Sequence, residues 1–278
     1  MKSCLRKDDE LLDDIKAAEQ SPRPFHVWWL GQSGFLVQWQ GHHLLIDPYL
    51  SDSLTQKYAE TDKPHVRITE RVIDPARLDF IDLVTSSHNH TDHLDGETLT
   101  HLLQANPNLV ITVPAANRAF AAQRLDVQAD RLTPIDAGQS LIAGGFSMHA
   151  LPAAHNELDQ DEEGRYKYLG YIFNFGEYAI YHSGDTLLYE GLADQLKTFN
   201  IDLAILPING NKPERRVAGN LNAVEAAELA EEIGAGCVVP CHYDMFEFNT
   251  ADPAEFAEEC EALGQPHTIM QCGERWSA

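Results

Sequence analysis

The spacing of apolar residues predicts a chain that begins with one amphipathic helix and then alternates between strands and helices. Leu11 and Ile15 fall on one face of a helix over residues 8–19, and a segment with two prolines then breaks it. Residues 1–24 are therefore interpreted as an N-terminal helical extension that packs on the remaining domain, residues 25–278, or on a partner subunit. Nothing in this extension carries chemistry.

Short apolar runs between glycine-rich turns predict the strands of the main domain, and longer periodic runs predict its helices. The expected strands span residues 26–30, 35–39, 44–46, 109–113, 131–135, 140–148, 168–175, 178–181, 238–240 and 267–270. Two of the expected helices span residues 97–104 and 115–125. A third begins at Thr186, with Leu188, Leu192 and Leu196 facing inward. A fourth begins at Asn222 with a capping box, and a fifth begins at Asp252, with Phe256, Cys260 and Leu263 facing inward. No shift in composition marks a linker, so one α/β domain is expected.

Four metal-capable side chains follow the apolar run Leu83-Val84-Thr85 within six positions: His88, His90, Asp92 and His93. In an extended chain alternate side chains share a face, so His88 and His90 can point at one spot. The next turn can bring Asp92 and His93 toward a neighbouring spot. Imidazole and carboxylate suit a zinc-class or manganese-class ion, and a catalytic site keeps one position free for water. A polar loop with unrelated histidines is the weaker interpretation, because histidine is scarce.

Three further candidate ligands each follow a predicted strand, which is where α/β sheets usually place their sites. They are His155, Asp185 and His242. Asp47 also ends a strand. An aspartate in this place could hold a ligand imidazole from behind, although a simple turn aspartate fits its spacing equally well.

Two polar segments are candidates for the surroundings of the site. Residues 51–75 are expected to form a loop over one edge of it, with His65 exposed. A later loop carries side chains that could grip an anion, because arginine forks match phosphate or carboxylate. They are Asn209, Asn211, Arg215, Arg216 and Asn220. A solvated pair is an equally good interpretation of the two arginines.

Composition limits the compartment and the partners. Apolar residues make up 44% of the 278 residues, and no run approaches the ~20 apolar residues of a membrane span. The charged N-terminus does not resemble a secretory signal, and five irregularly spaced cysteines do not suggest a disulfide framework, so a cytoplasmic protein is expected. A net charge of −23 argues against nucleic acid and anionic membranes as partners. A small anionic substrate is expected instead, since a metal and a few arginines can dominate a pocket. The N-terminal helix could serve a homo-oligomer interface.

The order of the candidate ligands resembles that of the metallo-β-lactamase superfamily: a His-x-His-x-Asp-His motif, a lone histidine, a bridging aspartate and a final histidine. This resemblance covers nearly the whole chain and implies a four-layer αββα sandwich. Finer motifs are similar to the L-ascorbate-6-phosphate lactonase branch. They are Trp28-Trp29-Leu30-Gly31-Gln32-Ser33-Gly34-Phe35, Ile46-Asp47-Pro48-Tyr49-Leu50-Ser51-Asp52, Leu206-Pro207-Ile208-Asn209-Gly210 and Pro240-Cys241-His242-Tyr243-Asp244-Met245-Phe246.

Carried over residue by residue, the resemblance implies two adjoining metal sites. The first would be formed by His88, His90 and His155. The second would be formed by Asp92, His93 and His242. Asp185 would bridge the two, and Asp47 matches the family's aspartate behind the ligands. The branch implies one or two zinc or manganese ions per chain.

The expected function is a metal-dependent hydrolase in which metal-bound hydroxide opens the lactone of a sugar acid similar to ascorbate 6-phosphate. A divalent ion lowers the pKa of its bound water from about 15.7 to roughly 7 and polarises the carbonyl under attack. Asp92 is the candidate general base. One alternative is a phosphodiesterase of the same superfamily that acts on a small molecule. Another is a metal-bound scaffold without turnover, which the complete ligand set argues against.

Overall fold

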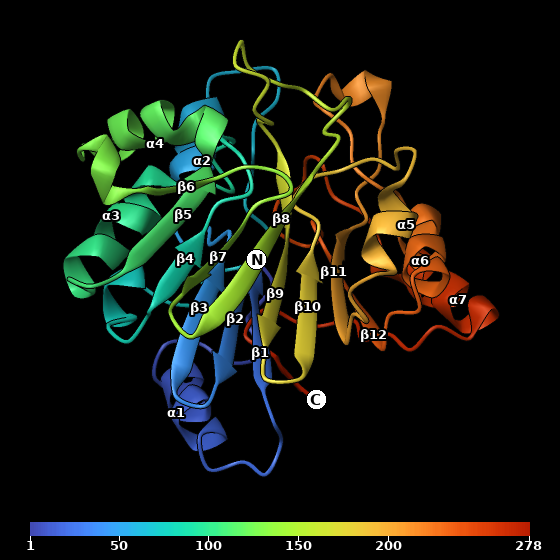
Figure 1. The fold of residues 1–278 in the computed structure, drawn as a ribbon, viewed down its shortest axis with the longest axis horizontal. Coiled ribbons are helices and arrows are strands. Elements are labelled where there is room, and N and C mark those ends of the chain that lie inside the picture. The colour runs from blue at the N-terminus through green and yellow to red at the C-terminus, as the bar shows by residue number, and fades with distance from the viewer.

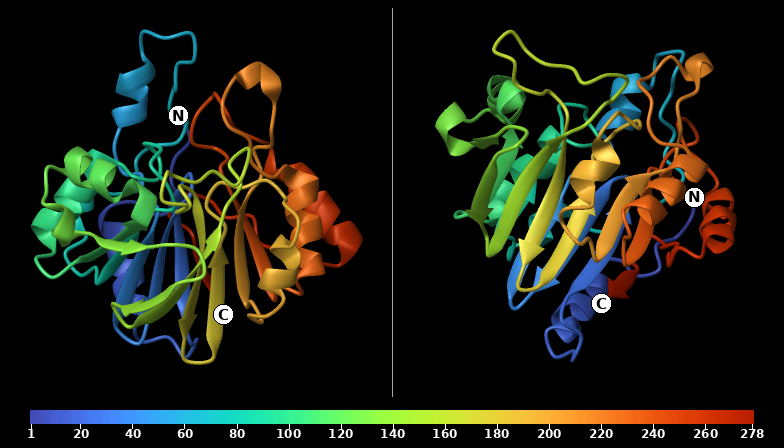
Figure 2. Two further views of the ribbon diagram at one scale, coloured as in Figure 1. Left: turned by 45° about the horizontal axis from the view of Figure 1, so that its top comes forward. Right: turned by 45° about the vertical axis from the view of Figure 1, so that its right-hand side comes forward.

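Two β-sheets pack face to face in the computed structural model, which describes residues 1–278, and helices cover the outer surface of each sheet (Figures 1 and 2). In Figure 1 the helices α3 and α4 lie on the left of the two sheets, and α5, α6 and α7 lie on the right. The αββα sandwich implied by the sequence resemblance is therefore confirmed.

The first sheet has seven strands in the order β13-β1-β2-β3-β4-β5-β6. Its strands are β1 (His26–Gly31), β2 (Gly34–Trp39), β3 (His42–Ile46), β4 (Leu83–Thr85), β5 (Val110–Pro114), β6 (Thr133–Ile135) and β13 (Arg275–Ser277). The strands from β13 to β3 pair antiparallel, and those from β3 to β6 pair parallel. The parallel half presents its carboxyl ends at one edge of the sheet.

The second sheet has six strands in the order β12-β11-β10-β9-β8-β7. Its strands are β7 (Ser140–Ala143), β8 (Phe146–Pro152), β9 (Leu169–Phe175), β10 (Tyr178–His182), β11 (Leu203–Pro207) and β12 (Cys237–Cys241). β10, β11 and β12 pair parallel, and the remaining neighbours pair antiparallel. This sheet too is mixed, with its parallel strands at one side.

Seven α-helices and four short 3₁₀ turns connect the strands. The helices are α1 (Asp9–Ala18), α2 (Ser53–Tyr58), α3 (Gly96–Ala105), α4 (Arg118–Leu125), α5 (Leu192–Leu196), α6 (Ala223–Glu232) and α7 (Pro253–Leu263). The 3₁₀ turns are η1 (Pro75–Arg77), η2 (Ala115–Asn117), η3 (Ala129–Arg131) and η4 (Pro213–Arg215). The capping box expected at Asn222 is present, because Asn222 and Glu225 each bond the other's backbone N–H at 2.9 Å.

Alternation along β1 explains why this strand is apolar at almost every position. Val27 and Trp29 point into a core of 44 buried residues that lies between the sheets and under α5 to α7. Trp28 and Leu30 point the other way, into a second core of 24 buried residues shared with α1, α3 and α4. A sheet covered on both faces needs apolar side chains on both, so its strands lose the usual polar alternation. Leu11 and Ile15 of α1 belong to the second core, although the domain boundary at residue 24 stays a prediction.

Several predicted elements differ from the structure. Residues 140–148 are not one strand but the hairpin of β7 and β8, which turns at Gly144 and Gly145. The helix expected at Thr186 begins only after Gly191, because the Thr186 hydroxyl is instead bonded to the backbone of Ala154. Leu188, placed in the core by the sequence pattern, is 46% exposed.

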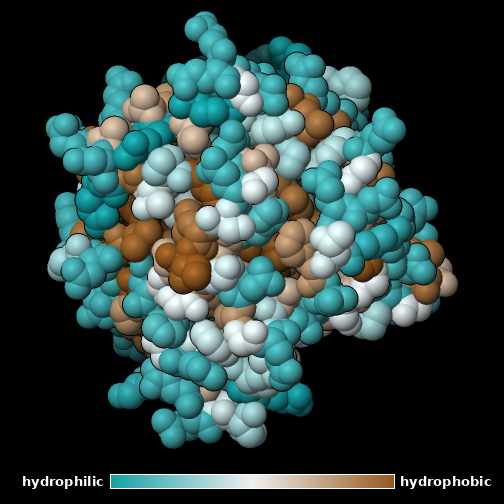
Figure 3. All heavy atoms as spheres, in the orientation of Figure 1, coloured by the Kyte–Doolittle hydropathy of each residue, from teal (hydrophilic) through white to brown (hydrophobic).

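The C-terminal end also differs from its prediction. Residues 267–270 form no strand beyond a single bridge to β12, and the closing strand is β13 at the far edge of the first sheet. Leu263, expected inward, is partly exposed at the end of α7. The face of the molecule in Figure 3 is mostly hydrophilic, with scattered apolar areas near its middle. No helix is both long and apolar enough to cross a membrane.

Candidate metal centre

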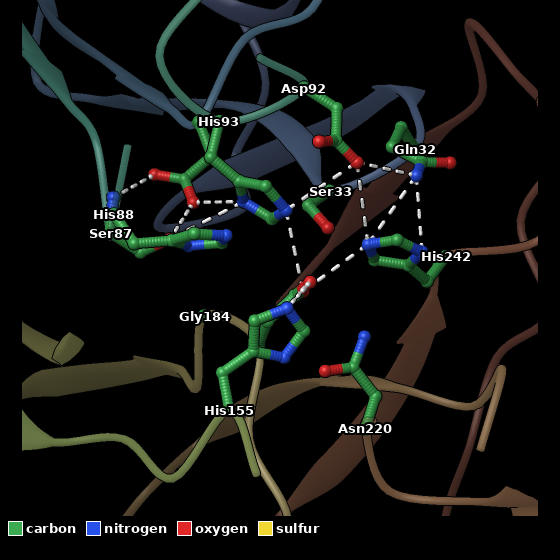
Figure 4. A network of polar contacts seen from close by, with 12 residues as sticks. Gln32, Ser33, Ser87, His88, Asp92, His93, His155, Gly184, Asn220 and His242 are labelled. Carbon is green, nitrogen blue, oxygen red and sulfur yellow. Dashed lines mark hydrogen bonds and ion pairs between the residues drawn. The ribbon is translucent and has the colours of Figure 1, made fainter. Parts of the chain in front are cut away.

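All seven side chains predicted as metal ligands meet at one edge of the sandwich, where loops leave four strands. Figure 4 labels His88, Asp92, His93, His155 and His242 among them. The loop after β4 supplies four of them. Those after β8, β10 and β12 supply one each. The contributing residues are His88, His90, Asp92, His93, His155, Asp185 and His242. Strands from both sheets therefore build a single cluster.

The ligand atoms fall into two adjoining groups, within each of which they lie no more than 4.8 Å apart. One group contains His88, His90, His155 and Asp185. The other contains Asp92, His93 and His242. Three or four imidazole and carboxylate donors at this spacing match the coordination number of a zinc-class or manganese-class ion. The cluster can therefore bind metal.

The carboxylate of Asp185 lies between the two groups. Its Oδ1 is 3.3 Å from His93 Nε2 and 3.2 Å from His242 Nε2, whereas its Oδ2 is 3.7 Å from His155 Nε2. Each oxygen thus faces a different group, and the side chain is almost fully buried. The sequence could place Asp185 after a strand, but only the structure shows that its two oxygens divide between the groups.

Several buried polar atoms of the cluster have no hydrogen-bond partner. They include His88 Nε2, His93 Nε2 and Asp185 Oδ1. A buried polar atom without a partner costs about 1–3 kcal/mol of folding free energy. A cation coordinated by these atoms would remove that cost, so the unpaired atoms fit a bound metal ion.

Asp47 fixes the orientation of the His93 ring from behind. Its Oδ1 accepts a hydrogen bond from Ser87 N at 2.9 Å, and its Oδ2 accepts one from the Ser87 hydroxyl and lies 2.7 Å from His93 Nδ1. The carboxylate keeps the proton on Nδ1, so the lone pair of Nε2 faces Asp185. His155 is held similarly, because its Nδ1 lies 2.9 Å from the carbonyl oxygen of Gly219.

The charges around the cluster favour a cation at its centre. Burial lowers the pKa of His88 well below its ordinary value, so this ring keeps a free lone pair. Burial acts to lower the pKa of His93 too, but the carboxylates of Asp185 and Asp92 outweigh it and raise that pKa well above its ordinary value. For Asp185, burial acts to raise the pKa, and His242 and His93 outweigh it and hold the pKa well below its usual range.

A glycine allows the chain to deliver Asp185. Gly184 has φ +60°, a conformation that side-chain-bearing residues rarely adopt. A Cβ at this position would lie 2.6 Å from the carbonyl oxygen of Leu169 and 2.8 Å from the Cβ of Ser87. The loops after β10 and β4 can therefore approach each other closely only because residue 184 has no side chain.

Gln32 belongs to the cluster, although the sequence analysis assigned it no role. Its amide nitrogen lies 2.9 Å from Asp92 Oδ2 and 3.1 Å from His242 Nδ1, so it links two members of the second group (Figure 4). The backbone carbonyl of Gln32 also accepts the His242 N–H at 3.1 Å. The only signal in the sequence was a polar residue inside a glycine-rich turn, which is common in turns without function.

A cavity of about 470 Å³ opens over the cluster. Its lining includes four basic side chains: Lys57, Lys63, Arg124 and Arg216. The only acidic side chains that line it are Asp92 and Asp185. In Figure 2 (left) the segments around residues 53–65 and 211–218 rise on the same side of the molecule. The expectation that residues 51–75 form a loop over the site is partly right: residues between 54 and 65 line the cavity, but residues 53–58 form the helix α2 and not a loop.

His65 is not exposed as expected. It is partly buried, stacks on Tyr58 with ring centroids 4.5 Å apart, and lines the cavity. Its Nδ1 lies 2.9 Å from the Lys63 carbonyl oxygen. The polar sequence around residue 65 concealed this burial, because two aromatic neighbours of the ring, Phe246 and Phe248, come from a distant segment.

The predicted anion-binding loop is mostly occupied with internal contacts. Of its five residues only Arg216 lines the cavity. Arg215 donates to Asn249 Oδ1 at 2.9 Å and to the carbonyl oxygens of Asn209 and Thr250. Asn220 is buried and donates to Asn209 Oδ1 at 3.0 Å, and Asn211 is exposed. Arg215 and Asn209 therefore support the loop, and Arg216 reaches the cavity.

Comparison with known proteins identifies the family. The family model described as "Beta-lactamase superfamily domain" matches residues 42–243. The chain belongs to this superfamily. It is also similar to a UPF0173 metal-dependent hydrolase of Methanopyrus kandleri, with 30% identity over 241 residues, 86% of this chain and 92% of the relative. A second UPF0173 metal-dependent hydrolase, of Caldivirga maquilingensis, is 28% identical over 90% of this chain and 96% of its own.

Solved structures of the same fold support the architecture. An isothiocyanate hydrolase from Delia radicum gut bacteria aligns with a TM-score of 0.72 at 19% identity, over 91% of this chain and 98% of that one. Igni18, a metallo hydrolase of Ignicoccus hospitalis, aligns with a TM-score of 0.67 at 22% identity over the same shares. Family and cluster together make this chain a metal-dependent hydrolase of the metallo-β-lactamase superfamily.

Proposed function

We propose that this hydrolase opens the lactone ring of an anionic sugar-acid derivative, and that its two ligand groups hold one or two zinc or manganese ions. His88, His90 and His155 would hold the first ion. Asp92, His93 and His242 would hold the second, with Asp185 shared between them. The observation that carries the proposal is the position of Asp185, which faces both groups at the floor of a cavity lined by basic side chains.

The chemistry needs an ion and a proton acceptor. A bound divalent ion supplies hydroxide near neutral pH and polarises the ester carbonyl. Asp92 suits the role of general base, because it lines the cavity and Gln32 holds its Oδ2 at 2.9 Å. Burial acts to raise the pKa of Asp92, but the nearby His93 and His242 outweigh it and lower that pKa, which keeps the group in its carboxylate form.

The basic lining supports an anionic substrate. The chain carries 43 acidic and 20 basic side chains, yet four basic ones line this single cavity. Lys63 and Arg216 are linked, because the Lys63 ammonium donates to the Arg216 carbonyl oxygen at 2.5 Å. Both side chains line the cavity, where a phosphate or carboxylate group of the substrate could pair with Lys63 and could replace Asp62, which pairs with the Arg216 guanidinium in this structure.

The first test is metal content together with turnover. Mass spectrometry would measure the metal content of three gently purified proteins: the wild type, Asp185→Asn and the control Asp194→Asn. Asp194 is an exposed residue on α5. Each would then be assayed on lactones and on bis-aryl phosphates. We expect one or two ions per chain and lactone opening in the wild type and the control, with both strongly reduced in Asp185→Asn. Phosphodiester cleavage alone would favour the phosphodiesterase alternative, and bound metal without turnover would favour the scaffold.

A second test addresses the substrate charge. Lys63→Met should raise KM about tenfold for a phosphorylated lactone, because a hydrogen bond to a charged group contributes roughly 1.5 kcal/mol. KM for a neutral lactone should be unchanged. Lys197→Met, which removes an exposed lysine that pairs with Glu232 on the outer helices, is the matched control. Equal effects of Lys63→Met on both lactones would contradict an anionic substrate.

A further inference from the structure

The side chain of Arg124 reaches from α4 to the turn of residues 89–94, which carries three of the seven candidate ligands: His90, Asp92 and His93. Its Nη1 donates to the carbonyl oxygen of Asn89 at 2.8 Å and to that of Leu94 at 2.9 Å. These two carbonyls stand on either side of His90, Asp92 and His93. One guanidinium group therefore joins the beginning and the end of the ligand turn.

The ligand turn has few other restraints of its own. Within it, Leu94 N donates to the His90 carbonyl oxygen at 2.8 Å and His93 N donates to the same oxygen at 3.2 Å. Asp47 fixes the His93 ring from behind. The His90 ring makes no side-chain hydrogen bond, and Asp92 is held only through Gln32 and its histidine neighbours. The directions of the His90 and Asp92 side chains therefore depend on the backbone conformation of the turn, which the Arg124 guanidinium holds at both ends.

Arg124 is itself held in place. The Phe120 ring, one turn earlier on α4, lies 4.4 Å from the guanidinium carbon. On the other side the chain passes close by at Gly96, where a Cβ would lie 3.3 Å from Arg124 Cγ. No carboxylate forms an ion pair with this arginine, so its donors are directed to the two carbonyl oxygens. Both bonds come from one guanidinium nitrogen, Nη1, which carries two N–H groups, one for each carbonyl oxygen.

We propose that Arg124 is a positioning residue of the metal centre, which holds residues 89–94 in the conformation that directs His90 and Asp92 at their ions. This inference rests on the proposed assignment of those two residues as ligands. Removing an outer partner of a metal ligand typically weakens metal binding by about 10- to 100-fold. Arg124 acts on the backbone of the whole turn, so a loss in this range is expected.

The chain offers a matched control on the same helix. Arg118 is also partly buried, and its Nε donates to the carbonyl oxygens of Ala129 at 2.8 Å and Leu132 at 3.2 Å, away from the ligand turn. Arg124→Met and Arg118→Met therefore each remove from α4 a guanidinium that bonds two backbone carbonyls, although the Ala129 carbonyl keeps Leu132 N–H as a donor at 3.1 Å. Only the first loss should reach the metal centre.

The experiment measures metal affinity and coordination. Metal-free wild type, Arg124→Met and Arg118→Met would be titrated with Zn²⁺ against a chromophoric chelator and with Co²⁺ while its visible absorption is recorded. We expect zinc affinity at least tenfold weaker and altered cobalt bands in Arg124→Met. In Arg118→Met, affinity should stay within threefold of wild type with unchanged bands. Arg124→Lys, which keeps the charge and can satisfy one carbonyl, should fall between the two.

Two outcomes would overturn the proposal. One is an Arg124→Met protein with the affinity and cobalt bands of wild type, and the other is an equal loss in Arg124→Met and Arg118→Met. If Arg124→Met does not fold, Arg124→Lys is compared with Arg118→Lys by the same criteria. Wild-type protein that binds neither ion would overturn the ligand assignment and this proposal together. Normal binding in every variant would leave the assignment in place and overturn the role of Arg124 alone.

Discussion

Replacing Asp47 with asparagine removes one carboxylate oxygen from a fully buried network and leaves the size of the side chain unchanged. Asp47 accepts hydrogen bonds from Ser87 N, from the Ser87 hydroxyl and from His93 Nδ1. Its φ of +43° is a conformation that asparagine also tolerates well. The substitution therefore tests the hydrogen bonds and the charge with little backbone strain.

The asparagine amide can accept at one end only, so two arrangements are possible. If its NH₂ group faces His93, the ring must accept at Nδ1 and carry its proton on Nε2, which removes the lone pair directed at Asp185. If the NH₂ group faces Ser87, the backbone N–H of Ser87 loses its acceptor. A buried donor left unsatisfied costs about 1–3 kcal/mol. Both arrangements also remove the negative charge behind His93, which lowers the basicity of the ring as a metal ligand. We therefore expect a loss of metal affinity of about 10- to 100-fold, or roughly 1.4–2.8 kcal/mol.

The measurement is competition between Asp47→Asn and a chelator for Zn²⁺, with circular dichroism to show that the metal-free protein is folded. Asp74→Asn is the control, because Asp74 also accepts from a backbone N–H, that of Ala76 at 3.0 Å, but at the surface turn η1. Asparagine caps such turns about as well as aspartate, so the control should bind metal like wild type. Wild-type affinity in folded Asp47→Asn would refute the argument that Asp47 sets the His93 proton.

Three further predictions concern stability. Gly184→Ala should destabilise the protein by about 3 kcal/mol or more in urea unfolding, because backbone strain and a clash with Leu169 combine. Its control, Gly138→Ala, has φ +78° but no atom within 4 Å of the added Cβ, so it should cost only about 1 kcal/mol. Equal costs for the two variants would contradict the close approach at Gly184. Tyr171→Phe should cost about 1–2 kcal/mol in the same assay, because its buried hydroxyl donates to the Ser86 carbonyl oxygen at 2.8 Å; an unchanged midpoint would show that this bond contributes nothing. Burial lowers the pKa of His43, and its Nε2 lies 3.0 Å from the Gln38 amide nitrogen, so protonation is disfavoured in the folded state. Below a pH of about 6.5 His43 is therefore protonated more fully in the unfolded chain than in the folded protein. For this reason the free energy of unfolding of the metal-free protein should fall as the pH falls from 7 to 5. His43→Gln should make that fall shallower, and an identical slope would contradict the role of His43.

The sequence anticipated the elements whose signals are local. The spacing in α1, the capping box of α6 and the three strands from β1 to β3 are each set by residues a few positions apart, and the structure agrees with them to within about two residues. The errors arose where local signals were ambiguous. Residues 140–148 read as one apolar run, yet two glycines turn it into a hairpin. Leu188 fits a helical stripe, but the Thr186 hydroxyl accepts a hydrogen bond from the Ala154 N–H and does not cap a helix, which starts later.

The candidate ligands were identified from sequence because metal chemistry accepts few side-chain types and four of them occur within six positions. What they bind and how they are held was not readable in this way. The contacts of Gln32, Arg124 and His65 join segments that are far apart along the chain, and each of these residues is individually ordinary. In the loop of residues 209–220 the residue types suggested an anion grip, but the structure uses Arg215 to hold Asn249 and leaves only Arg216 at the cavity.

The sequence by itself determined the set of donors and the strands that deliver them, since donor chemistry and hydrophobic periodicity are properties of neighbouring residues. Only the tertiary structure decided that Asp185 faces both ligand groups, that Asp47 sets the His93 proton, and that basic side chains from separate helices and loops line one cavity. These are distances between residues on different strands and sheets. They follow from how two sheets pack across a shared core, and no local pattern encodes that packing.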